Sequence, residues 1–169
     1  MILTERDLEF DFSQSVKATK LDPPGQPLPI GMKLVDFVVQ ELTRTLLVEV
    51  KDPSAAADPS ASIASYVERL KQQELIHDEL TPKARDSYSF LHLMREDILP
   101  FVFVFAVGVE GAGADPALLQ NVKDRLTRRI RQECATPWKR AYIRECVVIR
   151  LSDWNRRFSI YPMKRLPTP

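Results

Sequence analysis

The spacing of apolar residues along the chain predicts alternating strands and helices. In residues 8–13, Leu8, Phe10 and Phe12 alternate with polar side chains, which is the period of a half-buried strand. Residues 101–109 are instead uniformly apolar, as expected for a strand that is buried on both faces. Three further strands are predicted at residues 33–40, 44–51 and 142–151.

Helical spacing of apolar residues predicts three helices between these strands. They cover residues 60–80, 81–97 and 115–134. Residues 21–31 contain four prolines and two glycines and are predicted to form a loop, and the glycines of residues 108–115 indicate a turn. The predicted order β, ββ, αα, β, α, β favours a mixed α/β fold, with a central mixed β-sheet flanked by helices.

Composition indicates an ordinary soluble domain. The 169 residues are 44% hydrophobic and 28% charged, so we expect one globular domain over residues 1–169. No apolar run approaches the roughly 18 residues that span a bilayer, and the charged N-terminus lacks the apolar centre of a signal peptide. Two cysteines are too few for a disulfide framework. We therefore expect a cytoplasmic protein with no membrane association.

Charge is distributed unevenly along the chain. Residues 1–122 carry 11 Lys or Arg against 19 Asp or Glu, whereas residues 123–169 carry 13 against 4. The third predicted helix is amphipathic, and its outer face carries Lys123, Arg125, Arg128, Arg129 and Arg131. This face predicts contacts with nucleic-acid phosphates. An acidic patch on a partner protein would suit it as well, and a solvated basic face without a partner is the structural alternative.

Three charged side chains interrupt the two apolar strands predicted between residues 33 and 51. Asp36 lies inside the first strand, and Glu49 and Lys51 lie at the end of the second. A hairpin turn at residues 41–44 sets a register in which Asp36 faces Glu49, with Cβ atoms about 5 Å apart. Lys51 is two residues beyond Glu49 and therefore points to the same side of the sheet.

Two carboxylates at this separation repel each other, and one of them should resist ionisation. A divalent cation would remove that conflict, and oxygen ligands at this density suit Mg²⁺ or Mn²⁺. Such an ion lowers the pKa of a bound water, and a nearby lysine can offset negative charge on a phosphate. The pattern thus predicts hydrolysis of a phosphodiester. The structural alternative is an exposed strand face with an ordinary Glu–Lys pair.

The motif formed by "LVDFVVQ" and "TLLVEVKD" resembles the PD-(D/E)XK nuclease superfamily, which has the restriction-endonuclease-like fold. This resemblance implies a core of a helix, a three-strand meander, a helix and a further strand, within residues 8–109. Residues 115–169 would then be a C-terminal extension. It also implies that Asp36 and Glu49 are metal ligands, that the Val50 carbonyl is a third ligand, and that Lys51 is the catalytic lysine. Val35 replaces the proline of the motif.

The resemblance implies two further site residues. An acid from the first helix often joins the site in this fold, and four upstream acids remain open for that role: Glu5, Glu9, Asp11 and Asp22. The helices after the third strand often carry a basic residue that contacts the site, and we assign this role to Lys83. The alternative for Lys83 is a solvent-facing first helical turn.

Two functions follow as hypotheses. The first is a Mg²⁺- or Mn²⁺-dependent nuclease, whose nucleic-acid partner is expected to be DNA rather than RNA. The second is an inactive nuclease-like domain that binds a protein or a nucleic acid. The mode of cleavage, the substrate sequence and the oligomeric state are left open by the sequence.

Overall fold

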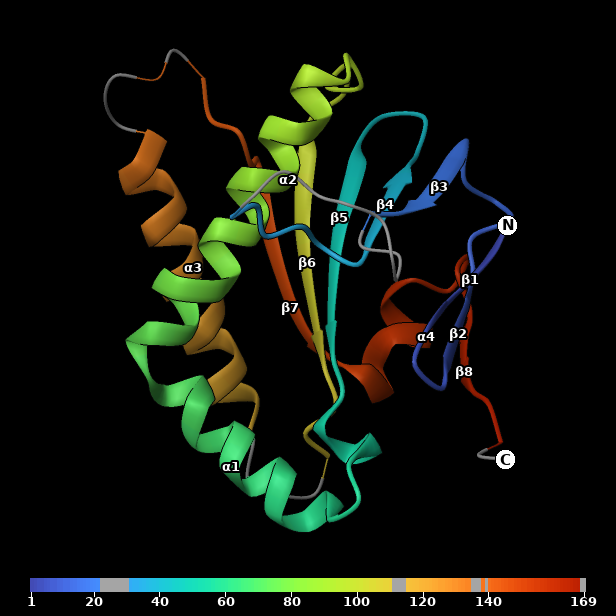
Figure 1. Ribbon diagram of the computed structural model, residues 1–169, viewed down its shortest axis with the longest axis vertical. Coiled ribbons are helices and arrows are strands. Elements are labelled where there is room, and N and C mark those ends of the chain that lie inside the picture. The colour runs from blue at the N-terminus through green and yellow to red at the C-terminus, as the bar shows by residue number, and fades with distance from the viewer. Residues whose placement is uncertain (22–30, 111–114, 135–137, 139, 168–169) are drawn as a thin grey trace.

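Two β-sheets and a layer of helices make up the described part of the chain (Figure 1). The computed structural model describes residues 1–21, 31–110, 115–134, 138 and 140–167. Most of the predicted proline-rich loop and half of the predicted glycine turn lie outside these residues, as does Asp22.

The larger sheet has five strands and is mixed. In spatial order its strands are β3 (Lys17–Lys20), β4 (Phe37–Gln40), β5 (Thr45–Lys51), β6 (Phe101–Val107) and β7 (Glu145–Arg150). The pairs β3–β4 and β4–β5 are antiparallel, whereas β5–β6 and β6–β7 are parallel. The α/β fold class and the central mixed sheet are therefore confirmed.

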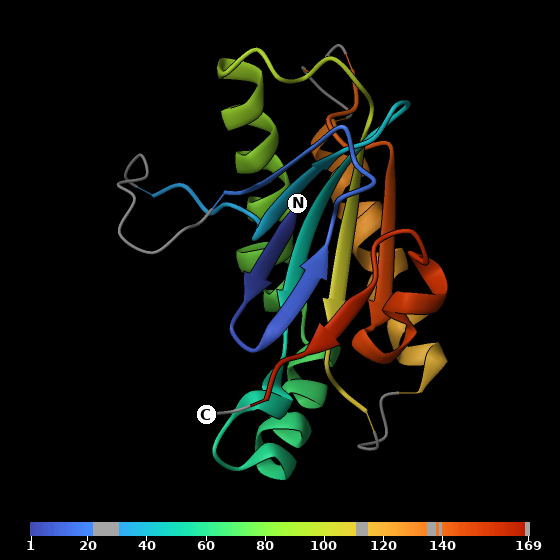
Figure 2. The same ribbon diagram turned by 90° about the vertical axis from the view of Figure 1, so that its right-hand side faces the viewer.

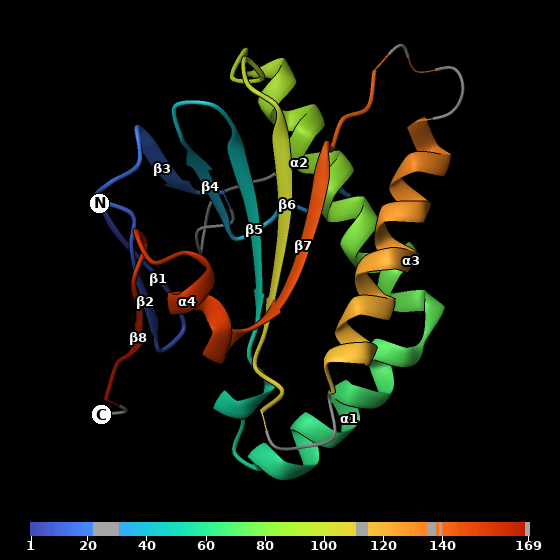
Figure 3. The ribbon, with the colours of Figure 1, turned by 180° about the vertical axis from the view of Figure 1, so that it is seen from behind.

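Helices cover one face of this sheet. They are α1 (Pro59–Lys71), α2 (Thr81–Leu93) and α3 (Pro116–Cys134), and they stand together on the same side of the strands in Figures 1 and 3. Phe103 and Phe105 of β6 belong to the buried cluster on this side, together with Leu70 of α1, Ala84 of α2 and Leu126 of α3. Burial of these apolar side chains stabilises the layer.

A second, smaller sheet covers the other face (Figure 2). Its strands β1 (Ile2–Glu5), β2 (Leu8–Asp11) and β8 (Met163–Arg165) are antiparallel, and the single-turn helix α4 (Trp154–Arg157) packs beside them. The centre of this layer is aromatic, because the Phe10 ring lies 5.3 Å from Phe37 and 5.0 Å from Trp154 between ring centres. The three long helices α1, α2 and α3 therefore all flank the sheet on the side opposite to the small sheet.

The strand predicted over residues 8–13 exists, but it belongs to the small sheet. The first strand of the antiparallel meander is instead β3, which the apolar pattern does not reveal because its sequence "KATK" is mostly polar. β1 and β8 were not predicted either. At the other end of the chain, β7 is the fifth strand of the central sheet and pairs with β6 over its whole length. β7 thus completes this sheet.

The helix predicted over residues 60–80 is interrupted. α1 ends at Lys71, and Gln72 adopts an extended backbone with ψ of 149°. A π-helical turn, η2 (Leu75–Leu80), then leads directly into α2. The interruption is stabilised by Arg125 of α3, which donates to the carbonyls of Lys71 and Gln72 at 3.1 Å each and also to that of Leu70. These bonds satisfy carbonyl groups that a helix end leaves without partners.

Candidate functional site

The β4–β5 hairpin positions the candidate acids. Gln40 pairs with Thr45, which confirms the predicted register, and Asp36 and Glu49 follow one residue beyond the last strand pair. Side chains two residues away from each acid belong to the core on the helix side. Because alternate residues of a strand share a face, both acids point toward the helices.

Asp36 is buried and carries an unfavourable charge. Its residue is 7% exposed, and its carboxylate Oδ2 accepts a hydrogen bond of 2.7 Å from the Val50 N–H. Burial, followed by the charge of Glu49, raises the pKa of Asp36 from 3.8 to about 7, although Lys83 and the Val50 N–H oppose this rise. The expected conflict between the two carboxylates is therefore present.

Glu49 lies at the centre of the cluster and is completely buried. The Nζ atom of Lys51 lies 2.7 Å from its Oε1 atom, and Nζ of Lys83 donates to its Oε2 atom at 2.7 Å. Although Oε1 is close to Lys51, it has no well-aligned hydrogen bond among the described residues. Burial opposes the charge on Lys51, but Glu49 and then Glu79 outweigh it and raise the pKa of Lys51.

Three residues that the sequence did not predict extend the cluster beyond Lys51: Glu79, Arg69 and Tyr66. Glu79, on the π-helical turn, has Oε1 3.3 Å from Lys51 Nζ and Oε2 2.5 Å from a guanidinium nitrogen of Arg69. The Tyr66 hydroxyl is buried without a hydrogen-bond partner in the described chain, and burial together with the charge of Glu79 raises its pKa. Glu79 lies on the π-helical turn that precedes Thr81, and such turns occur often at functional sites. An interruption of the helix before Thr81 is therefore the signal that could have pointed to Glu79.

The end of β5 is held from the opposite side of the sheet. Asp52 follows Lys51, and its buried carboxylate accepts from Arg165 of β8 at 2.6 Å. Gly108, just beyond β6, faces this carboxylate closely, because a Cβ atom there would lie 2.3 Å from Asp52 Oδ1. The same Arg165 also binds Asp7, so the small sheet fixes the strand that carries Glu49.

The donor set suits a hard divalent cation in part. The carboxylates of Asp36 and Glu49 could hold Mg²⁺ or Mn²⁺ with waters completing the shell. Burial, and then the charge of Glu49, raise the pKa of Asp36, and a cation there would stabilise its ionised form. No group of three or more His, Cys, Asp or Glu side chains suited to a metal occurs among the described residues. Both Glu49 oxygens also contact lysines, so a cation would compete with Lys51 for Oε1.

Of the four upstream acids considered, Glu5 is electrostatically coupled to the site. It forms an ion pair of 2.8 Å with Lys20, and its charge contributes to the raised pKa of Asp36. Glu9 is paired with Lys164 at 2.9 Å. Asp11 accepts from the backbone N–H of residue 13 at 2.9 Å. The first 21 residues form strands β1, β2 and β3, so the helix that the resemblance places before the meander does not occur there.

The predicted basic face of α3 is divided between internal and external contacts. Arg125 binds the end of α1, and Arg129 forms an ion pair of 3.2 Å with Glu133. Arg128 and Arg131 are exposed, and Lys123 is half-buried. The part of this face that can meet a partner is therefore smaller than the sequence indicates.

The geometry assembles Asp36, Glu49, Lys51 and Lys83 in one cluster on the helix-covered side of a mixed α/β sheet. Comparison with known proteins found no matching family model, no matching curated protein and no matching solved structure. Within the described residues, no helix has both the length and the apolar character needed to cross a membrane.

Proposed function

We propose that the protein is a metal-dependent nuclease of the PD-(D/E)XK type that hydrolyses phosphodiester bonds in nucleic acid, preferably DNA. The observation that carries the proposal is the meeting of two carboxylates and two lysines at one end of β5. Asp36 has a pKa of about 7 beside fully buried Glu49, and Lys51 and Lys83 each lie 2.7 Å from Glu49. Charges buried at this density are unusual outside functional sites.

Each residue of the cluster has a separate role in this proposal. Asp36, Glu49 and the Val50 carbonyl would hold the cation. A bound Mg²⁺ or Mn²⁺ supplies a water of lowered pKa and offsets charge on the phosphate. The Lys51 side chain is 30% exposed, so its ammonium can reach a phosphate and neutralise the charge that develops there. Lys83 is 13% exposed and keeps the Glu49 carboxylate oriented.

Cleavage of DNA and RNA substrates with Mg²⁺ or Mn²⁺ tests the proposal. We expect Asp36→Ala and Lys51→Ala each to reduce the rate at least about 100-fold, because each removes a group that acts on the charge of the reacting phosphate. Lys164→Ala is the matched control, since Lys164 pairs with Glu9 on the small sheet. Activity that persists in both site variants would refute the proposal.

Thermal unfolding supplies a test that does not depend on turnover. A cation that binds the folded protein raises the melting temperature by mass action. We expect Mn²⁺ to raise it in the wild type and in Lys164→Ala, and to have no effect in Asp36→Ala. An equal rise in all three proteins would place the cation elsewhere.

A second candidate is a nuclease-like domain that binds nucleic acid or a partner protein without cleaving it. The observation that favours it is the internal pairing of Glu49, whose two oxygens both contact lysines while the residue is completely buried. In that case Asp36→Ala leaves binding unchanged, and Mn²⁺ does not alter the melting temperature. Exposed Arg128 and Arg131 would then supply the phosphate contacts.

A further inference from the structure

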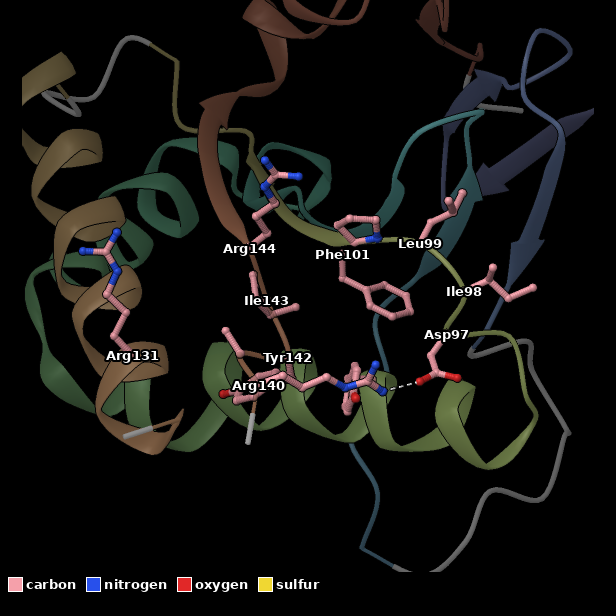
Figure 4. A pocket seen from close by; sticks show the side chains of 12 residues that line it. Asp97, Ile98, Leu99, Phe101, Arg131, Arg140, Tyr142, Ile143 and Arg144 are labelled. Carbon is pink, nitrogen blue, oxygen red and sulfur yellow. Dashed lines mark hydrogen bonds and ion pairs between the residues drawn. The ribbon is translucent and has the colours of Figure 1, made fainter. Parts of the chain in front are cut away.

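A cavity of about 480 Å³ lies where β6 and β7 begin, at the end of these strands that is opposite to Glu49 (Figure 4). This size is typical of small-molecule sites, which range from about 300 to 1,000 Å³. β5 and β6 are parallel, and Glu49 pairs with Phe105 near the far end of β6. The cavity is therefore separate from the acid–lysine cluster.

The lining of the cavity combines an apolar interior with a basic rim. Figure 4 shows Phe101 between Ile143 and Ile98, with Arg140 reaching toward Asp97. The apolar and aromatic lining residues are Tyr88, Ile98, Leu99, Pro100, Phe101, Ala141, Tyr142 and Ile143. The charged lining residues are Asp97 and three arginines, Arg131, Arg140 and Arg144.

Positive charge in the rim exceeds its negative charge. Asp97 is the acidic lining residue, and it is already shared by Arg140 at 2.5 Å and His92 at 2.7 Å. Arg131 and Arg144 have no acidic partner among the described residues. The two unpaired guanidinium groups leave the rim suited to an anion, and their planar forks match phosphate oxygens.

The aromatic part of the lining favours a ligand with a flat apolar body. The Tyr88 ring lies 5.6 Å from Phe101 and 5.9 Å from Tyr142 between ring centres, and the Arg140 guanidinium lies 5.7 Å from the Tyr88 ring. The Tyr88 and Phe101 rings meet edge to face, and such a cluster of ring and guanidinium surfaces can add contacts to a ligand ring. An inorganic anion would leave the apolar surface unused.

We propose that this cavity binds an organic phosphate with a ring-bearing body, of the nucleoside monophosphate class. Arg131 and Arg144 bind the phosphate, and the surface around Phe101 and Tyr88 receives the ring. The ligand can be a free nucleotide or the phosphorylated end of a nucleic-acid strand, since both present the same chemistry. The proposal is independent of metal binding by Asp36 and Glu49.

Intrinsic tryptophan fluorescence can report binding. The Trp138 ring is 6.3 Å from Tyr142 and is 47% exposed, whereas Trp154 is completely buried under the other face of the sheet. A ligand in the cavity therefore changes the emission of Trp138 and leaves that of Trp154 constant. Titration uses adenosine monophosphate, inorganic phosphate and a 5′-phosphorylated oligonucleotide.

We expect Arg144→Gln and Arg131→Gln each to weaken binding of adenosine monophosphate about tenfold, the effect of losing one charged hydrogen bond. Arg156→Gln is the control, because Arg156 is exposed on α4 and pairs with Asp153. Asp36→Ala should bind as the wild type does, which separates this site from the proposed nuclease site. Tighter binding of the oligonucleotide would assign the cavity to strand ends, and tighter binding of the mononucleotide to free nucleotides.

Two results would overturn the proposal. One is unchanged affinity for adenosine monophosphate in the Arg131→Gln and Arg144→Gln variants, which would show that these two arginines do not bind the phosphate. The other is equal affinity for inorganic phosphate and adenosine monophosphate, which would show that the surface around Phe101 and Tyr88 does not contact the ring. The three arginine variants replace exposed side chains, whereas Asp36 is buried, and the folding of all four is verified by the cooperativity of thermal unfolding.

Discussion

The two faces of β5 differ sharply in what they bury. On the face that meets the small sheet, Val48 and Val50 pack with Phe10, Phe37 and Trp154 in an apolar and aromatic cluster. On the face that meets the helices, the corresponding positions near the end of the strand are Glu49 and Lys51, and Glu49 is completely buried.

This contrast separates stability from function within one strand. Apolar burial on the small-sheet face stabilises the fold directly. Burying Glu49 with Lys51 and Lys83 requires their desolvation, which the attraction between them only partly offsets. Valine at these positions would stabilise the fold more than the charged cluster does. The presence of the charges therefore favours the proposal that they have a chemical role.

The largest expected effect is on the apolar face. Trp154 is completely buried, and its ring centre lies 4.7 Å from that of Phe158 in a tilted arrangement. Its indole N–H donates to the Tyr161 carbonyl at 2.7 Å. We expect Trp154→Ala to lower the free energy of unfolding by about 4 kcal/mol, measured by urea denaturation. The reason is the cavity together with the lost hydrogen bond.

Trp154→Ala should leave the helix-side cluster unchanged if the two faces are independent. Provided that the variant unfolds cooperatively, we expect Mn²⁺ to raise its melting temperature by as much as it raises that of the wild type. A lost metal response would show that the small sheet controls the site, through the Asp52–Arg165 pair or otherwise.

The second prediction concerns the pH dependence that Asp36 imposes. Its pKa of about 7 in the folded protein lies above the ordinary value of 3.8, so the folded state binds the proton more tightly than the unfolded state does. The free energy of unfolding therefore falls as pH rises from about 4 to about 7. Since one pKa unit corresponds to about 1.4 kcal/mol, the penalty approaches about 4 kcal/mol above pH 7.

Asp36→Asn removes this titration. We expect the stability of the variant, relative to the wild type, to increase as pH rises from about 4 to about 7, as measured by urea unfolding at each pH. A constant difference across this interval would mean that Asp36 is ionised throughout. Because Asn keeps an oxygen that can accept from the Val50 N–H, the change mainly removes the charge.

The third prediction tests whether the lysines depend on Glu49. Glu49→Gln leaves Lys51 and Lys83 facing a neutral amide in a buried setting, and we expect a loss of about 3 kcal/mol in the free energy of unfolding. The double variant Glu49→Leu with Lys83→Met should recover much of this loss, because it replaces an ion pair with apolar groups. An unchanged stability in Glu49→Gln would show that both lysines escape to solvent.

The sequence was sufficient to predict the parts of the fold that depend on local pattern. The β4–β5 hairpin follows from two apolar runs of the right length, and its register correctly brought Asp36 and Glu49 to the same face. β6 follows from its unbroken apolar sequence. β3 could not be predicted from "KATK", because this short polar strand is stabilised mainly by pairing with β4. β8 pairs with β2 from the opposite end of the chain.

The candidate site was predictable to the same extent. Lys83 was expected near the site, and its Nζ atom does reach Glu49. Glu79 was not predicted, because its position depends on the π-helical turn and on Arg69 of α1. Arg125 was assigned to the basic face, yet it binds the end of α1, since contacts between helices cannot be read from periodicity.

The smallest expected effect concerns Glu79, whose side chain is 16% exposed and which shares Lys51 with Glu49. Lys51 keeps its closer partner in Glu79→Gln, so we expect a loss of about 1 kcal/mol, at the upper end for partly exposed ion pairs. The matched control is Glu68→Gln, which breaks an exposed pair with Lys71 and should change stability by less than about 0.5 kcal/mol. Combining Glu79→Gln with Lys51→Met isolates their coupling, and the two effects should be less than additive, although Glu79 still loses its pair with Arg69. Additive effects would exclude Glu79 from the cluster and confine the buried charge of this face to Asp36, Glu49 and the two lysines.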